Sequence, residues 1–165
     1  MHSIFAATSI ILPLLASSAV TPIPSPFVGT ILAPTSGLVI ASGAEIPFAY
    51  QTRNWCEQAY TEFKVSIVPY APTFDNVTDA DGTLQDALHE FGTFTVVNFP
   101  TIPPQGIPPP ETLTVPDLTE LTGSAIDNSE LFIAVSDIFL SCPGHVIEEI
   151  GVTSVPILYN PISIP

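Results

Sequence analysis

Apolar and polar residues alternate along much of the chain with the two-residue period of β-strands. Apolar side chains occupy every second position of Ile46–Tyr50, and in Phe63–Val68 they alternate with Lys64 and Ser66. A sheet that turns one face to the core requires this alternation. Together with other short apolar segments bounded by turn residues, the pattern predicts strands at Val28–Leu32, Leu38–Ala41, Ile46–Tyr50, Phe63–Val68, Phe91–Phe99, Leu113–Val115, Leu131–Leu140 and Val146–Tyr159.

The segment Leu131–Leu140 is the longest apolar run after residue 19, and we predict that it forms a central strand. About seven strands, with turns roughly every ten residues, predict an all-β fold and, more specifically, an immunoglobulin-like β-sandwich. There is no internal repeat, so residues 20–165 are expected to form a single domain.

Two segments depart from the strand pattern. Leu84–Phe91 carries apolar residues at helical spacing directly after Thr83, which predicts a short helix with Thr83 as its N-cap. Pro100–Pro110 contains six prolines in eleven residues. Because proline donates no ladder hydrogen bond, this segment is predicted to be an extended, polyproline-like connection over an edge.

The first 19 residues are typical of a secretory signal peptide. An apolar run from Ile4 to Leu15 precedes small residues, which put Ser17 and Ala19 at the −3 and −1 positions of a cleavage site before Val20. The run is about a dozen residues long, short of the roughly 20 that span a bilayer. Segment 151–165 is interrupted by prolines and lacks the apolar tail of a glycolipid-anchor signal. We therefore expect a secreted, extracellular protein without a membrane anchor.

The mature chain is strongly acidic. It keeps the formal net charge of −14, because residues 1–19 contain no Asp, Glu, Lys or Arg. Arg53 and Lys64 are its two strongly basic residues, whereas binding to nucleic acid or to anionic lipid needs many such cations. Both functions are excluded on this ground. The 46% hydrophobic content is enough for a core rather than a disordered tail, and we expect a monomer.

The cysteines Cys56 and Cys142 form an isolated pair, which in an oxidising compartment most simply makes one disulfide. The chain-entropy model gives such a bridge roughly 4–5 kcal/mol of stabilisation. Each cysteine follows a main predicted strand, and in an immunoglobulin-like topology the connections after these two strands lie at the same pole. We therefore expect the bridge to tie two connections together at one end. In antibody domains, by contrast, it pins the two sheets through the core.

The opening of the mature chain has a recurring turn pattern. It combines a Pro-x-x-Gly turn in Ala33–Gly37, a second glycine in Ala41–Gly43, and alternating aromatics in Ile46–Tyr50. With the closing segment Ile150–Ser154, it resembles fungal extracellular immunoglobulin-like modules over about residues 28–160. Such modules occur in small secreted proteins of basidiomycetes and at the front of Ser/Thr-rich cell-wall proteins linked to β-glucan assembly. The resemblance implies the fold and a setting at a wall or surface. It brings no catalytic residues, and the chain lacks the Ser/Thr-rich stalk of the wall proteins.

Metal-binding patterns in the sequence are incomplete. His145-x-x-Glu148 offers two of the three protein ligands that a catalytic zinc usually takes, and nothing completes the set. The acidic segment Asp75–Gly82 partly imitates a calcium loop, but the alignment places Val77 and Leu88 where oxygen ligands are needed. We therefore expect no metal and no cofactor.

Catalytic patterns are equally incomplete. Ser136, Asp137 and Ser141 lie near His145 in sequence, but no nucleophile elbow surrounds either serine. With sixteen acidic residues in the chain, a catalytic carboxylate pair of the glycosidase type remains an alternative. The sequence therefore favours a non-enzymatic protein. A secreted hydrolase, or an effector-like structural protein, remains as the alternative.

With the metal-binding and catalytic patterns incomplete, a ligand-binding site is the kind of functional site that remains. Arg53, Trp55 and Tyr60 place two aromatics and a cation in one connection, and the disulfide is expected to bring His145 close. Aromatics with polar neighbours stack on sugars, so the predicted partner is a cell-wall polysaccharide or an extracellular protein. The alternative, that Trp55 packs over the disulfide as a lid, is favoured because aromatics mostly bury. Asn76 begins an Asn-Val-Thr glycosylation sequon, which predicts an exposed segment.

Overall fold

The computed structural model describes residues 21–122, 128–144 and 146–160. The predicted signal peptide, residues 1–19, and the candidate residue His145 lie outside the described residues. The fold of the described part is all-β, with a single short α-helix. No helix in these ranges is long and apolar enough to cross a membrane.

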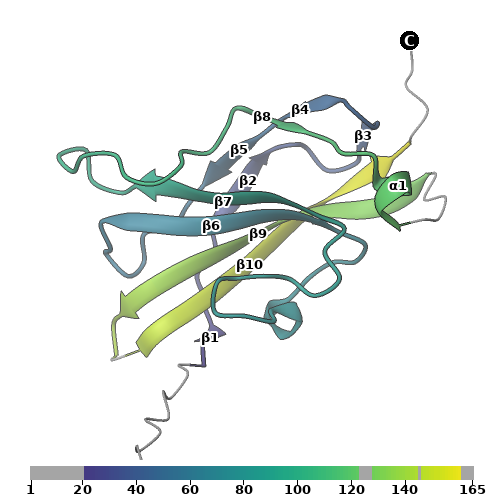
Figure 1. Ribbon diagram of the computed structural model, residues 1–165. Coiled ribbons are helices and arrows are strands. Elements are labelled where there is room, and N and C mark those ends of the chain that lie inside the picture. The colour runs from purple at the N-terminus through teal and green to yellow at the C-terminus, as the bar shows by residue number, and fades with distance from the viewer. Residues whose placement is uncertain (1–20, 123–127, 145, 161–165) are drawn as a thin grey trace, which may run out of the picture.

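A six-stranded mixed sheet forms the larger part of the molecule (Figure 1). Its long strands β9 and β10 lie side by side and antiparallel, whereas the short strands β1 and β3 both pair with β10 in parallel. The position of β9 between β10 and β6 confirms that the Leu131–Leu140 run is a central strand. In spatial order the strands are β1 (Ile23–Pro24), β10 (Val146–Tyr159), β9 (Ser129–Cys142), β6 (Tyr60–Val68) and β7 (His89–Val97), with β3 (Leu38–Ile40) also on β10.

Four short strands form two separate pairs. β2 (Thr30–Ala33) pairs with β5 (Ala49–Gln51), and β4 (Glu45–Pro47) pairs with β8 (Thr112–Thr114). The predicted strand Ile46–Tyr50 is thus split at Phe48, where the chain changes partner and the Phe48 N–H donates to the Glu111 carbonyl at 2.8 Å. This split and the unpredicted strand β1 bring the eight predicted segments to the ten strands of the described residues.

The main core lies between one face of the large sheet and these short pairs. Alternate residues of β6 and β9 supply one side of it, as the period of two predicted. Phe48 and the β4–β8 pair supply the other side. The fully buried members at this interface include Phe63, Val65, Ile67, Ile133, Val135, Ile157 and Tyr159.

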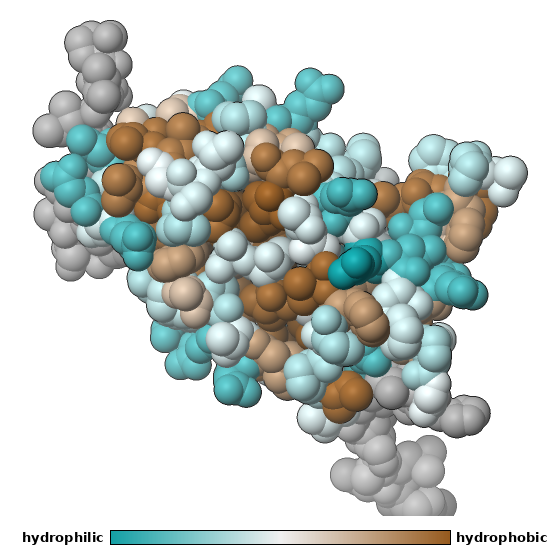
Figure 2. All heavy atoms as spheres, turned by 180° about the vertical axis from the view of Figure 1, so that it is seen from behind, coloured by the Kyte–Doolittle hydropathy of each residue, from teal (hydrophilic) through white to brown (hydrophobic). Residues whose placement is uncertain are grey.

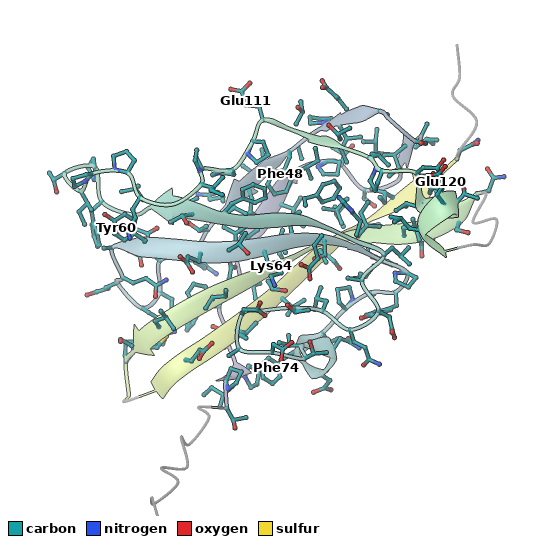
Figure 3. The ribbon with its side chains drawn as sticks, in the orientation of Figure 1. Phe48, Tyr60, Lys64, Phe74, Glu111 and Glu120 are labelled. Carbon is teal, nitrogen blue, oxygen red and sulfur yellow. A yellow bond between two sulfur atoms is a disulfide. The ribbon has the colours of Figure 1, made fainter. Side chains whose placement is uncertain are left out.

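The loop Ala71–Leu88 covers part of the opposite face of the large sheet. Leu84 packs there against Val68 and Ala134 in a smaller buried cluster. Lys64 points to the same side, as Figure 3 shows, and its ammonium donates to the Asp81 carboxylate at 2.8 Å and to the Thr83 hydroxyl at 2.6 Å. A buried lysine needs such partners, so the ion pair holds the loop against the sheet.

The predicted helix over Leu84–Phe91 is wrong. Leu84 forms a bridge with Val77, and the Gln85 N–H donates to the Asn76 carbonyl at 2.8 Å, so the backbone here pairs across the loop. Asp86 then takes a left-handed conformation with φ of 52°, which ends any helical path.

The one α-helix of the described residues is α1, Leu118–Thr122. It is capped by Asp117, whose Oδ1 accepts the N–H of Thr119 at 3.0 Å and of Glu120 at 3.3 Å. An aspartate followed three residues later by a glutamate is a helix-start signal that the strand-based prediction passed over.

The proline-rich segment Pro100–Pro110 lies along the outer edge of β7, as predicted. The Thr95 N–H donates to the Ile107 carbonyl at 2.7 Å, and the Tyr60 hydroxyl donates to the Pro103 carbonyl at 2.8 Å. A Cβ on Gly106 would collide with the Thr95 side chain, so the chain can approach β7 this closely only with glycine there. The segment therefore shields an edge that would otherwise be open to pairing.

Candidate functional site

The disulfide lies at one end of the large sheet. Cys56 sits in a turn between β5 and β6, Cys142 is the last residue of β9, and their Cα atoms are 4.4 Å apart. The predicted pairing is therefore confirmed. The expectation that the bridge ties two connections together is corrected, because β9 runs on to Cys142: the bridge ties one connection to the last residue of a strand, and both cysteines are buried. It fixes the starting point of β6 relative to the end of β9.

Trp55 packs against this bridge. It contacts the buried cluster of Cys56, Phe139 and Cys142, and its ring centroid is 4.4 Å from that of Phe27. Its indole N–H donates to the buried Glu149 carboxylate at 3.2 Å. This half-buried position is the geometry of a lid over the disulfide, and the hydrogen bond satisfies the indole.

Tyr60 opens β6 on a different part of the surface. Figure 3 shows it at the end of the strand, next to the proline-rich segment and away from Lys64 and Phe74. A groove of about 300 Å³ lies beside it. The groove is lined by Gln58, Tyr60, Glu62, Ile138, Leu140 and Ser141.

The apolar floor of the groove belongs to the sheet itself. Ile138 pairs directly with Glu62 across β9 and β6, so their side chains stand next to each other on one face. Ile138 is buried, whereas Leu140 is 49% exposed. The groove thus combines an aromatic ring, an exposed aliphatic side chain and a carboxylate at its rim.

Gln58 holds one end of the groove in place. Its side-chain nitrogen donates to the Ile138 carbonyl at 3.2 Å, and its side-chain oxygen accepts the Leu140 N–H at 2.8 Å. The backbone carbonyl of Gln58 accepts a hydrogen bond from Asn98 Nδ2 at 2.9 Å. These bonds extend the β6–β9 ladder by one step through a side chain, which makes the groove wall rigid.

The structure does not gather all the predicted binding residues into one cluster. Arg53 is exposed in the connection before Trp55, which contacts the disulfide and Glu149, while Tyr60 lies in the groove. His145 lies outside the described residues. Sequence reasoning missed Gln58, Glu62 and Leu140, and the available signal was weak: Leu140 ends the long apolar run next to a polar Ser-Cys step.

Asp137 is the most perturbed acidic group described. It is fully buried in β9 on the core side, where its Oδ2 accepts the Gly29 N–H at 3.0 Å and a hydrogen bond from the Tyr50 hydroxyl. Its Oδ1 has no hydrogen-bond partner among the described residues. Burial raises the pKa of Asp137 to about 6, although the bonds from Tyr50 and Gly29 work in the opposite direction. Because it is fully buried, its carboxyl does not contact a substrate at the surface.

Among the described residues, one group brings three metal-ligating atoms within 4.8 Å of one another: Cys56, Cys142 and Glu149. Its two sulfurs are joined to each other and so are not thiolate ligands. In the acidic loop, Asp81 is paired with Lys64, which lowers the pKa of the Asp81 carboxyl. The groove beside Tyr60 is the candidate ligand site that contains a residue which the sequence predicted for binding.

No family model matches the chain, and no curated protein and no solved structure was found to be similar to it.

Proposed function

We propose that the protein is a secreted, non-enzymatic binding module that takes a polysaccharide of the cell wall or another surface in the groove beside Tyr60. The observation that carries the proposal is the composition of this groove. A half-buried tyrosine ring and the exposed Leu140 offer an apolar surface to the face of a sugar ring. Glu62, Gln58 and Ser141 surround it with groups that hydrogen-bond to hydroxyls.

The rigidity of the groove supports the same function. A preformed site avoids the entropy cost of ordering its side chains when the ligand binds. Gln58 is held by both of its side-chain polar atoms, the Tyr60 hydroxyl is bonded to Pro103, and the disulfide is close by in sequence at Cys142. The acidic rim favours a neutral sugar over an anionic ligand.

The immunoglobulin-like sandwich and the fungal wall setting are parts of this proposal. The short strand pairs pack on one face of the antiparallel β10–β9–β6 core of the large sheet, which supports a two-layer arrangement. The bridge joins the connection before β6 to the end of β9, so it lies at one pole of the sheet rather than between two sheets, which supports this arrangement. An intramolecular disulfide also supports an extracellular location.

The test is binding of the purified mature protein to insoluble β-glucan, chitin and cellulose, with soluble sugar assayed in the same tubes. We expect saturable binding to one of them without release of sugar. Tyr60→Ala or Leu140→Ala should weaken it about tenfold, the equivalent of one lost apolar contact. Leu158→Ala is the matched control, since Leu158 is an exposed leucine of β10 outside the groove.

Three results would contradict the proposal. Release of soluble sugar would show a hydrolase instead. Failure to bind any of the three polysaccharides would redirect the search to a protein ligand. Binding that Leu158→Ala weakens as much as Leu140→Ala would move the site away from the groove.

A further inference from the structure

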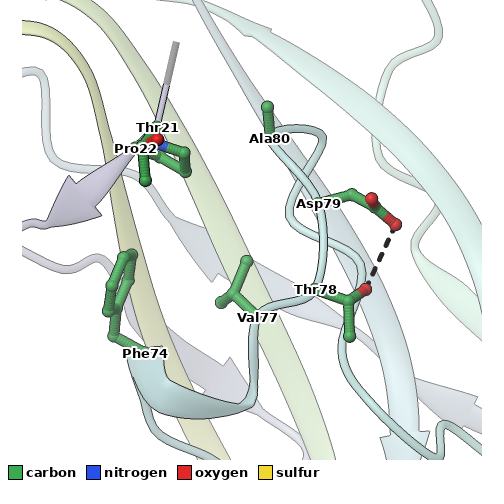
Figure 4. A pocket seen from close by; sticks show the side chains of 7 residues that line it. All are labelled: Thr21, Pro22, Phe74, Val77, Thr78, Asp79 and Ala80. Carbon is green, nitrogen blue, oxygen red and sulfur yellow. Dashed lines mark hydrogen bonds between the residues drawn. The ribbon is translucent and has the colours of Figure 1, made fainter. Parts of the chain in front are cut away.

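A second pocket borders the loop Ala71–Leu88 and shares no residue with the Tyr60 groove. It has a volume of about 490 Å³ and is walled by Thr21 and Pro22 from the start of the described chain, by Phe74, and by Val77–Ala80. Figure 4 shows the Phe74 ring across from Pro22, with Val77 beside it. The pocket therefore has an aromatic and aliphatic wall at one side and the polar residues Thr78 and Asp79 at the other.

The glycosylation sequon is built into this wall. Asn76 stands between the lining residues Phe74 and Val77, and the sequon threonine Thr78 lines the pocket as well. Asn76 ends the short 3₁₀ turn Phe74–Asn76, and its Oδ1 accepts the Thr73 N–H at 2.9 Å. Its Nδ2 donates no hydrogen bond to any described residue. Asn76 Oδ1 thus has a structural role as a hydrogen-bond acceptor. Asn76 Nδ2, the atom to which a glycan attaches, is available for that bond.

We propose that Asn76 carries an N-linked glycan whose innermost N-acetylglucosamine packs on Phe74 and enters this pocket. The inference rests on secretion of the chain but not on the ligand proposed for the Tyr60 groove. In the transfer step, Nδ2 forms a bond to the anomeric carbon of a sugar carried on a lipid diphosphate. One N–H proton is lost, the lipid diphosphate leaves, and nothing is oxidised or reduced.

The chemistry of the pocket fits that sugar. The apolar face of the ring and its acetyl methyl group match Phe74 and Val77, as aromatic side chains match sugars elsewhere. Its amide and hydroxyls match the Thr78 hydroxyl and the Asp79 carboxylate, which are hydrogen-bonded to each other at 3.2 Å. Because the sugar is tethered two residues from Phe74, its effective concentration at the pocket is high and even a weak contact is occupied.

Occupation of the pocket would fasten the loop Ala71–Leu88 to the start of the described chain at Thr21 and Pro22. On its inner side the loop is already held by the Lys64–Asp81 ion pair and the buried Leu84. The glycan would therefore act as a second clamp on the same loop, and its first sugar would carry the effect.

The test uses protein secreted from a eukaryotic host and compared in three forms. One form bears the full glycan, one is trimmed by an endoglycosidase to a single N-acetylglucosamine, and one has the glycan removed by an amidase. The amidase leaves an aspartate at position 76, whose oxygen can still accept the Thr73 N–H. We expect a glycan mass at Asn76. The first two forms should melt at the same temperature, and the third about 2–4 °C lower, the shift expected from one lost contact in a domain of this size.

Variants at Phe74 tie the effect to the pocket. In Phe74→Ala the three forms should melt together, whereas in Phe99→Ala, which removes an exposed aromatic outside the pocket, the difference should persist. If Phe74→Ala does not fold, Phe74→Leu should give a reduced difference. The proposal is overturned if Asn76 carries no glycan in the secreted protein, if trimming to one sugar already lowers the melting temperature fully, or if the Phe74 variants keep the whole difference.

Discussion

The buried carboxyl of Asp137 makes the stability of the protein depend on pH in an unusual direction. The pKa of Asp137 is raised to about 6 in the folded protein, chiefly by burial, against a reference of 3.8. The folded state therefore binds more protons than the unfolded chain between these two values. The stability contributed by this group is complete below pH 4 and is lost as the pH rises through 6.

The size of the effect follows from the shift. A difference of about two pKa units corresponds to roughly 3 kcal/mol at pH 7. Tyr50 does not add to it, because burial and the neighbouring Asp137 raise the pKa of the Tyr50 hydroxyl far above this range. Asp137→Asn should remove the effect, since an amide of the same shape can still accept the Gly29 N–H and has no charge to bury.

The assay is urea unfolding of the wild type and Asp137→Asn at several pH values from 3.5 to 7.5, followed through Trp55, the only tryptophan. Taking the difference between the two proteins cancels the titration of every other group. We expect the variant to gain about 3 kcal/mol relative to the wild type over this range. A difference in free energy of unfolding that stays constant from pH 3.5 to 7.5 would refute the reasoning.

Three further outcomes are expected. The double variant Cys56→Ala/Cys142→Ala should lower the free energy of unfolding by about 4 kcal/mol, measured as a lower urea midpoint. A change below about 1 kcal/mol would mean that the bridge barely restrains the unfolded chain. Lys64→Met should speed proteolysis of loop 71–88 while leaving the melting temperature within a few degrees of the wild type, because the Lys64–Asp81 ion pair holds a loop rather than the core. Unchanged cleavage rates would contradict this. Gly29→Ala should destabilise the fold by about 2 kcal/mol, since a Cβ there would collide with the Tyr50 side chain and the Gln51 carbonyl oxygen. A stability equal to the wild type would show that both groups can move aside.

The strands and the disulfide could be predicted because each depends on local information. The alternation in Phe63–Val68 predicts which side chains are buried. In a chain with two cysteines, each has one possible partner. The split of Ile46–Tyr50 could not be predicted, because the change of partner at Phe48 depends on which strands lie beside it. The failed helix at Leu84 has a similar cause, since pairing with Val77 overrides the local helical spacing.

The candidate site was harder to foresee than the fold. Tyr60 was singled out as an aromatic in the connection that contains Cys56, but Ile138, Leu140 and Ser141 in the groove come from another strand. Only the register of β6 on β9 places Glu62 beside Ile138. Trp55 and Tyr60, five residues apart in sequence, have different neighbours, because Trp55 packs on the disulfide in the turn and Tyr60 begins the strand that follows.

The position of the disulfide also determines whether a cut in the backbone separates the chain into two molecules. Two long connections, loop 71–88 and the proline-rich segment, both lie between Cys56 and Cys142 in the sequence. A single cut in either leaves two pieces that remain covalently joined through the sulfurs and paired within one sheet. A nicked molecule would therefore keep both pieces and its groove together until a reductant cleaved the disulfide.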